Sequence, residues 1–234
     1  MVQQASSTFV AEETMEVRYK PAGSFLNAVG ELADFVEQRG LFPHWTIESN
    51  VVQFRDAEKQ TKNLSAFVSF RNAGYVSLDG PTANFFADKA SSFLAQVCDN
   101  PHFKVPKVQR VGVRNRCFVK SDHSFEQIDE RLFQVLFRND FSSLFEAKRV
   151  DQSAIFEMTT GDTSIRLFIG PLRSNEAPKH FNIQSDHFAS AGLIVDIDTF
   201  SLTERTPTSA IAFIRKNAPV AWDRIFKLQA LLDA

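Results

Sequence analysis

The sequence predicts an α+β protein with two pseudo-duplicated halves, made of mainly antiparallel sheets flanked by amphipathic helices. Two periodicities support this prediction, because some segments alternate apolar and polar residues, as strands do, and others repeat apolar residues at helical spacing. The third observation is their order: each half ends with a long alternating segment followed by an amphipathic one. The halves are expected at residues 1–140 and 141–234, either as separate units or as one continuous domain.

The first half is expected to open with a strand at 9–19 and a helix that follows Pro21, a residue suited to the first helical turn. Apolar residues recur from Phe25 to Val36 at helical spacing, and Gly40 fits the end of that helix.

Three strands are expected next, at 45–55, 64–71 and 73–78. The last two form a hairpin, for which 72–74 (Asn-Ala-Gly) would supply the tight turn. The polar stretch 56–63 is expected to be a solvated loop.

A helix is expected to begin at Gly80-Pro81 and to stop at Asn100-Pro101, ahead of a strand within 105–120. After that strand, Ser124 and Gln127 have the spacing of a capping box at the start of a helix. The segment 141–145 is expected to continue as helix or turn.

The second half is expected to hold strands at 147–159, 163–169, 179–184 and 191–200, with 171–178 as a loop. Thr206 and Pro207 start a final helix, which Pro219 is expected to interrupt. That helix carries a wide apolar face, which either docks on its own sheet or on a second copy: Val220, Trp222, Ile225, Phe226, Leu228 and Leu232.

Composition narrows the functional classes. The chain has 24 Phe but only 2 Tyr and 2 Trp, and because Phe has no polar group, most of these rings are expected in the core. The net charge of −2 disfavours general polyanion binding, which usually needs a basic domain.

There is no apolar run of membrane-spanning length and no secretory signal at the N-terminus, so we expect a cytoplasmic protein with no membrane contact.

One segment, 105–120, concentrates positive charge on an alternating pattern. Arg110, Arg114 and Arg116 share one parity with Gly112, while valines and Cys117 take the other, so the strand has an arginine face and an apolar face. Lys107 and Lys120 flank the same segment and complete the set of candidate ligand- or partner-binding residues. Gly112 is expected to mark a bulge or a close backbone approach.

Three partners are possible for this arginine face. The preferred one is internal, because Asp196 and Asp198 lie on one face of the late strand at 191–200 and opposite charges pair across strands. The others are a phosphate or nucleic-acid backbone, which guanidinium groups bind well, and the acidic patch of a partner protein.

The segment Arg110-Val111-Gly112-Val113-Arg114 resembles the central Arg-x-Gly-x-Arg strand of a sporadically distributed bacterial family of uncharacterised proteins. Trp45, the acidic strand at 194–198 and the C-terminal helix at 218–232 extend the similarity over most of the chain. The chain differs by having Asn115-Arg116 where that family usually has an aromatic residue. The resemblance implies an α+β, pseudo-duplicated fold and no particular reaction.

Catalytic patterns are sparse. Asp196 and Asp198 are weak metal candidates, with Asp186 and His187 as further ligands, but their spacing matches no known metal loop. The five histidines lie in expected loops, and the two cysteines, Cys98 and Cys117, form neither a metal pattern nor a disulfide framework. Nucleophile elbows and glycine-rich phosphate loops are absent from the sequence, so no cofactor is expected.

These observations predict a non-enzymatic binding or assembly subunit that acts through a protein partner or a second copy of itself, within a bacterial multi-component system. The first alternative is a nucleic-acid or phosphate-ligand binder that uses the basic strand 104–120. The second is a metal-dependent enzyme at Asp196 and Asp198.

Overall fold

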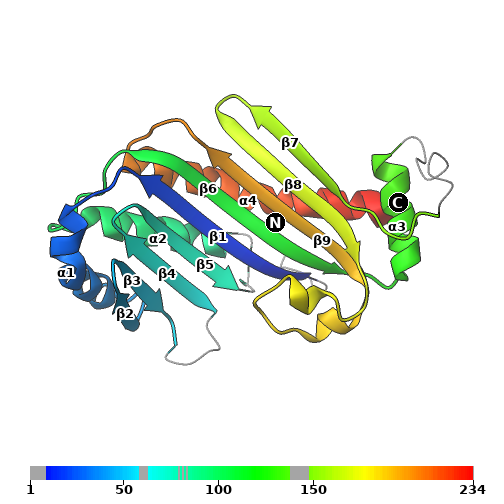
Figure 1. Cartoon of the computed structure of the whole chain (residues 1–234), viewed down its shortest axis with the longest axis horizontal. Helices are drawn as coiled ribbons and strands as arrows, with labels where there is room; N and C mark the ends of the chain where they lie inside the picture. Colours follow the sequence, from blue (N-terminus) through cyan, green and yellow to red (C-terminus); the bar gives the residue numbers. More distant parts are fainter. Residues whose placement is uncertain are drawn as a thin grey trace.

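Nine antiparallel strands form a single twisted sheet in the order β2-β3-β4-β5-β1-β6-β9-β8-β7 (Figure 1). The computed structural model describes residues 9–57, 63–78, 80, 82, 84–137 and 148–233. The strands are β1 (Phe9–Tyr19), β2 (His44–Glu48), β3 (Val51–Arg55), β4 (Leu64–Ser69), β5 (Asn72–Leu78), β6 (Val108–Lys120), β7 (Ala154–Thr160), β8 (Thr163–Leu172) and β9 (Gly192–Ser201).

Four helices cover one face of this sheet: α1 (Ser24–Gln38), α2 (Phe85–Asp99), α3 (Phe125–Leu136) and α4 (Pro207–Asp233). Figure 1 shows α4 running behind the sheet along its length, with α2 beside it. Inward-facing residues of the strands meet the apolar stripes of the helices, which is the packing that one buried sheet face requires. None of the helices described for this chain is long and apolar enough to cross a lipid bilayer.

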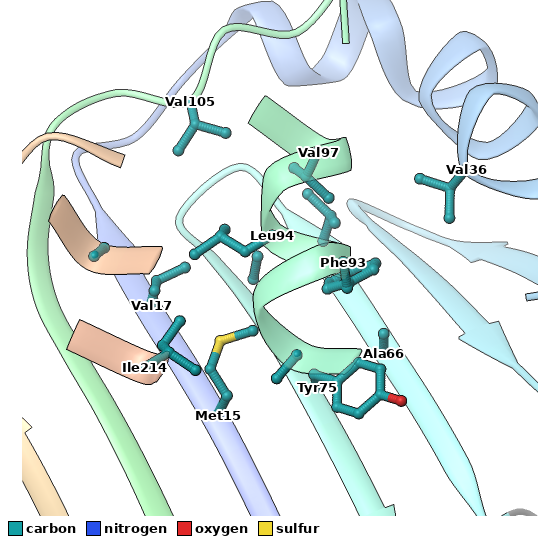
Figure 2. Packing of buried hydrophobic residues seen from close by; sticks show 14 of the residues in the cluster. Met15, Val17, Val36, Ala66, Tyr75, Phe93, Leu94, Val97, Val105 and Ile214 are labelled. Atoms are coloured by element: carbon teal, nitrogen blue, oxygen red, sulfur yellow. The ribbon is translucent and has the colours of Figure 1, made fainter. Parts of the chain in front are cut away.

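The core between sheet and helices is built largely from aromatic rings, as the Phe-rich composition predicts. Phe93 on α2 packs against Phe42, Phe54 and Tyr75, with ring centroids 5.9–6.0 Å apart. Figure 2 shows this region, where Met15 and Val17 of β1 face Leu94 of α2 and Ile214 of α4.

The opposite face of the sheet carries no helix longer than one turn among the described residues. Its β8–β9 end is covered by segment 173–191, which contains two short 3-10 helices (Ala177–Lys179 and Asp186–Ala189). Phe181 and Phe188 of this segment pack on Phe118, which points outward from β6. The rest of this face, called the open face below, lacks such a cover.

The α+β class and the antiparallel pairing are confirmed, but the strands form one sheet rather than several. β6 pairs with β9 over ten residues, so the two expected halves, 1–140 and 141–234, contribute to the same sheet. The four described α-helices flank one of its faces. No duplication is shown by this arrangement.

Several local predictions were wrong. The single strand expected at 45–55 is a hairpin, β2 and β3, because Ser49 takes a positive φ of 55° and reverses the chain. The β4–β5 hairpin is confirmed, but its turn precedes 72–74. The Ser69 hydroxyl accepts hydrogen bonds from the amides of Arg71 and Asn72 and organises the turn there.

Two predictions in the second half also fail. Segment 179–184 is not a strand, since the chain there folds over Phe118 between the two 3-10 helices. Pro219 does not interrupt α4, although an internal proline costs a helix about 3 kcal/mol. Ala218, Ala221 and Trp222 around it are buried against the sheet, and this packing holds the helix together.

Other expected details are confirmed. The capping box is present: Gln127 N donates to Ser124 Oγ, and the Ser124 amide donates to Gln127 Oε1. Trp222 and Ile225 of α4 dock on the chain's own sheet. The expectation for 141–145, and part of that for 56–63, lie outside the described residues, as does the side chain of Leu232.

Candidate functional site

The open face displays two adjacent rows of side chains across its central strands. In one row, Arg114 of β6 is opposite Asp198 of β9, which is opposite Arg166 of β8. In the next row, the same strands place Arg116, Asp196 and Phe168 side by side. The alternation predicted for β6 and β9 is therefore confirmed, and its arginines and aspartates meet on one face.

Ion pairs on this face form two neighbouring groups, together called the arginine–carboxylate ladder. In one, Arg110 pairs with Glu16 and Asp198; in the other, Asp196 pairs with Arg114 and Arg116, and Arg116 also pairs with Glu12. Arg110 donates from Nη2 to Asp198 Oδ2 at 3.1 Å and from Nη1 to Glu16 Oε2 at 3.3 Å. It thereby joins β6 to both of its neighbours, β1 and β9. Its guanidinium carbon also lies 5.0 Å from the centroid of the Phe200 ring.

Gly112 makes room for this arrangement. The sheet register is unbroken on both sides of Gly112, so the expected bulge is absent. A close approach is present, but it comes from a side chain rather than from backbone, because a Cβ at Gly112 would lie 2.9 Å from Arg110 Nη1. The side chain of Arg110 thus folds over the backbone at Gly112 to reach its carboxylates.

Arg114 and Arg116 share the other aspartate. Arg114 holds Asp196 with two hydrogen bonds, Nε to Oδ1 at 2.8 Å and Nη2 to Oδ2 at 2.5 Å. Arg116 lies 3.4 Å from Asp196 Oδ2 and 3.6 Å from Glu12 Oε2, and it donates to the carbonyl of His180 at 2.8 Å. Arg116 and Glu12 therefore tie the ladder to segment 173–191, where the amide of Asn182 also donates to Glu12.

Burial and pairing together shift the pKa values of several groups in the ladder. Burial raises the pKa of Asp198, and the positive charges of Arg110 and Arg114 only partly offset this effect. Burial also acts to raise the pKa of Glu16, but hydrogen bonds from Arg18 and Asn72, together with the charges of Arg18 and Arg110, outweigh it and lower that pKa overall. The hydrogen bond to Asp196 raises the pKa of Arg114.

Arg110 and Arg114 differ in their exposure and in the hydrogen-bond donors that they leave for a ligand. The side chain of Arg110 is 17% exposed and its guanidinium is engaged on two sides, whereas that of Arg114 is 48% exposed. Arg114 Nη1 makes no hydrogen bond to any described residue. Arg114 also lines a concavity of about 300 Å³ on the open face, together with Ile155, Arg166, Phe168, Asp196 and Asp198.

The remaining predicted candidates lie apart from this centre. Lys107 precedes β6 and pairs with Glu204 at 3.0 Å, while Lys120 ends the strand. Since strands rise about 3.3 Å per residue, the two lysines lie on the order of 40 Å apart. Asp186 and His187 belong to a 3-10 helix of segment 173–191, and no cluster of three or more His, Cys, Asp or Glu side chains suited to a metal occurs in the described part of the chain.

Sequence reasoning missed the free edge of the sheet at β7. Among the described residues this strand pairs with β8 alone, and in Figure 1 the hairpin reaches beyond the helices at the upper edge. Ile155 is 56% exposed, Phe156 36% and Met158 44%, so apolar side chains are exposed on both faces of the strand. The sequence predicted a strand at 147–159, of which the structure has only β7 (Ala154–Thr160) while residues 148–153 lie outside it, and the order of strands is what places β7 at an edge.

A buried carboxyl group on the helix side was also missed. Glu13 of β1 is fully buried, and its Oε1 accepts hydrogen bonds from Trp222 Nε1 at 2.8 Å and from Asn115 Nδ2 at 2.9 Å. Burial raises the pKa of Glu13 to about 8, although both hydrogen bonds act to lower it. The sequence did hold a signal for this burial, because Glu13 lies on the same face of the strand as the buried Met15 and Val17, two and four residues further on.

No protein-family model matches the chain, and no curated protein resembles it closely enough to be identified as a relative. The candidate functional features are therefore those of the molecule itself: the ladder with its concavity, and the free edge of β7.

Proposed function

We propose that this protein is a non-enzymatic assembly subunit that pairs with a second copy of itself through the free edge of β7. An unpaired strand edge presents a row of backbone donors and acceptors to any other strand, and natural proteins usually protect such an edge with charges, prolines or a covering element. The single observation that carries the proposal is that the edge strand β7 has few of these protections.

β7 has few of these protections. Glu157 is its only charged residue, and it contains neither proline nor lysine. Its partner in β8, Arg166, lies 3.7 Å from Glu157, which offsets part of that charge. Exposed apolar side chains beside free backbone groups are the features of strand-addition interfaces, where the backbone supplies affinity and side chains supply specificity.

The opposite edge of the sheet is better protected. β2 has five residues, His44–Glu48, and carries charge at Glu48. Trp45 of β2 donates a hydrogen bond to Glu37 of α1 at 2.9 Å, so the helix layer extends to this edge. The contrast favours β7 as the edge that accepts a further strand.

The sequence of β7 is compatible with itself in a twofold pair, the commonest symmetry of protein oligomers. An antiparallel register centred on Phe156 places Ile155 opposite Glu157 of the second copy and Ala154 opposite Met158. A register centred on Glu157 is disfavoured, because it sets two like charges opposite each other.

The ladder supports protein assembly over polyanion binding. Arg110 and Arg116 are each engaged by two carboxylates, so most of the positive charge of β6 is neutralised inside the protein. A phosphate backbone would have to compete with these pairs. The ladder instead stiffens the centre of the sheet from which the β7–β8 hairpin extends.

The test is the molar mass of the purified chain by size-exclusion chromatography with light scattering over a range of concentrations. We expect a dimer that dissociates on dilution, and we expect Met158→Lys to be monomeric at concentrations where the natural chain is dimeric. Leu26→Lys, at an exposed position on α1, is the matched control and should keep the dimer. A monomer at every concentration, or an unchanged dimer in Met158→Lys, would contradict the proposal. Absorbance at 260 nm in the same run detects bound nucleic acid, the rival outcome.

The duplication expected from the sequence also remains a proposal. It is supported by β6 and β9, which are neighbouring long strands with complementary outer faces and which are each followed by a helix, α3 and α4. A superposition of the β6–α3 unit on the β9–α4 unit tests it, and helices that fail to coincide when the strands are aligned would contradict it.

A further inference from the structure

We propose that the concavity beside Arg114 and Arg166 binds a free α-amino acid with an apolar side chain. The concavity opens on the face of the sheet rather than along the unpaired backbone edge of β7, although Ile155 of β7 contributes to its lining. Its lining combines two arginines, two aspartates and two apolar residues within about 300 Å³, which lies at the small end of the range of ligand pockets.

Two guanidinium groups supply unused hydrogen-bond donors. Arg114 donates from Nε and Nη2 to Asp196, and its Nη1 donates to no described residue. Arg166 is more than half exposed, and its one ion-pair partner among the described residues is Glu157 at 3.7 Å, beyond hydrogen-bond distance. Because both arginines flank Asp198 in the same row, a carboxylate placed between them can accept from both.

One carboxylate supplies an unused acceptor. Both oxygens of Asp196 are occupied by arginines, whereas Asp198 accepts through Oδ2 from Arg110 and its Oδ1 makes no hydrogen bond to the described residues. An ammonium group of a ligand above Asp198 could donate a hydrogen bond to this Oδ1 atom. The raised pKa of Asp198 has the same origin, since burial leaves its charge incompletely compensated.

The balance of charge selects among ligands. The lining holds two positive and two negative side chains, so a ligand with one charge of each sign matches it, while a multiply charged anion such as phosphate would be repelled by Asp196 and Asp198. Adjacent ammonium and carboxylate groups are the defining chemistry of an α-amino acid.

The wall of the concavity selects the rest of the ligand. Phe168 is directly opposite Ile155 on the β8–β7 hairpin, and both side chains line the concavity next to the charged row. An aliphatic side chain would pack on these two residues while the ammonium and carboxylate groups reach Asp198 and the arginines. Burying such a side chain adds affinity at about 25 cal/mol per Å² of apolar surface removed from water.

Isothermal titration calorimetry on the full chain tests the proposal with four probes: L-leucine, 4-methylpentanoate, isoamylamine and inorganic phosphate. 4-Methylpentanoate lacks the ammonium group of leucine and isoamylamine lacks its carboxylate. We expect saturable binding of L-leucine and binding at least tenfold weaker for the other three, because each lacks a charge that the site pairs.

Variants locate the binding. Arg166→Gln should weaken L-leucine binding by roughly tenfold or more, and because Arg166 is exposed the variant should fold normally. Arg39→Gln, an exposed arginine on the surface beyond α1, is the matched control and should bind as the natural chain does. The proposal is overturned if L-leucine shows no saturable binding at millimolar concentration, if phosphate or 4-methylpentanoate binds as tightly, or if Arg166→Gln binds unchanged. Because Met158→Lys leaves the lining intact, that variant should still bind L-leucine, which separates this proposal from the one on β7.

Discussion

The guanidinium group of Arg110 lies over the bare backbone of Gly112, two residues further along β6. A Cβ at Gly112 would come within 2.9 Å of Arg110 Nη1 and 3.1 Å of Nη2. From this position Arg110 reaches Glu16 on one neighbouring strand and Asp198 on the other. The glycine of the Arg-x-Gly-x-Arg segment is thus explained by space for its own arginine.

Gly112→Ala is expected to destabilise the protein by about 1 kcal/mol, because the new methyl group displaces Arg110 from one of its two carboxylates. The same substitution in an Arg110→Ala background should be neutral or slightly stabilising, since glycine itself weakens a strand. Urea unfolding of the four proteins in this double-mutant cycle measures the coupling. An equal loss of unfolding free energy for Gly112→Ala in both backgrounds would show that the lack of a side chain at Gly112 is not what positions Arg110.

Arg110→Ala should cost more stability than Arg114→Ala. Loss of Arg110 leaves the partly buried Asp198 without its direct partner and removes a partner of Glu16, and we expect a cost on the order of 2 kcal/mol. Arg114 is half exposed, so its loss should cost about 1 kcal/mol or less. Chemical denaturation at neutral pH compares the two variants, and the reverse order would contradict this division of roles.

Gly192 at the start of β9 is a second position where no side chain fits. A Cβ there would lie 2.5 Å from both the Phe118 ring and the Val119 carbonyl oxygen, and the backbone atom cannot move away cheaply. Gly192→Ala should therefore destabilise by about 2 kcal/mol or more. Gly30→Ala is the contrasting control, because a Cβ in the middle of α1 meets nothing within 4 Å and should stabilise the helix by about 0.5–1 kcal/mol. Thermal unfolding distinguishes the two variants. An unchanged melting temperature for Gly192→Ala would contradict the close packing of Phe118 and the Val119 carbonyl against Gly192.

The buried Glu13 predicts an unusual pH dependence. Burial raises its native pKa from 4.5 to about 8, so between these values the folded chain keeps a proton that the unfolded chain has lost. Stability should accordingly fall as pH rises from about 4.5 to 8, by an amount on the order of a few kcal/mol, and level off above that range.

Glu13→Gln should remove this contribution, because a neutral amide oxygen can still accept from Trp222 and Asn115. Urea midpoints at pH 5 and pH 8 should differ less in Glu13→Gln than in the natural chain. The exposed Glu157→Gln serves as the control that keeps the natural difference. If Glu13→Gln left the difference unchanged, Glu13 would not be the titrating group.

The parts of the site that could be predicted were those with local periodicity. The strand period of two placed Arg110, Arg114 and Arg116 on one face, and the same period in β9 supplied Asp196 and Asp198 as partners. The N-cap of α3 was equally predictable, because Ser124 and Gln127 carry its chemistry within four residues.

What could not be predicted depends on contacts between distant segments. Segment 179–184 has strand-like residues but packs its Phe181 over Phe118, and α4 tolerates Pro219 because its neighbours are buried. The exposure of β7 follows from the order of strands, and the position of Arg166 beside Asp198 follows from the register of β8 with β9. Neither is encoded within a window of neighbouring residues.

The most direct test of the central proposal is amide hydrogen exchange within β7, Ala154–Thr160, at low and at high protein concentration. If the free edge pairs with a second copy, the amides that face away from β8 should exchange more slowly at high concentration, and Met158→Lys should abolish this protection. Exchange in β7 that is rapid and independent of concentration, while the rest of the sheet stays protected, would contradict the assignment of β7 as the assembly edge.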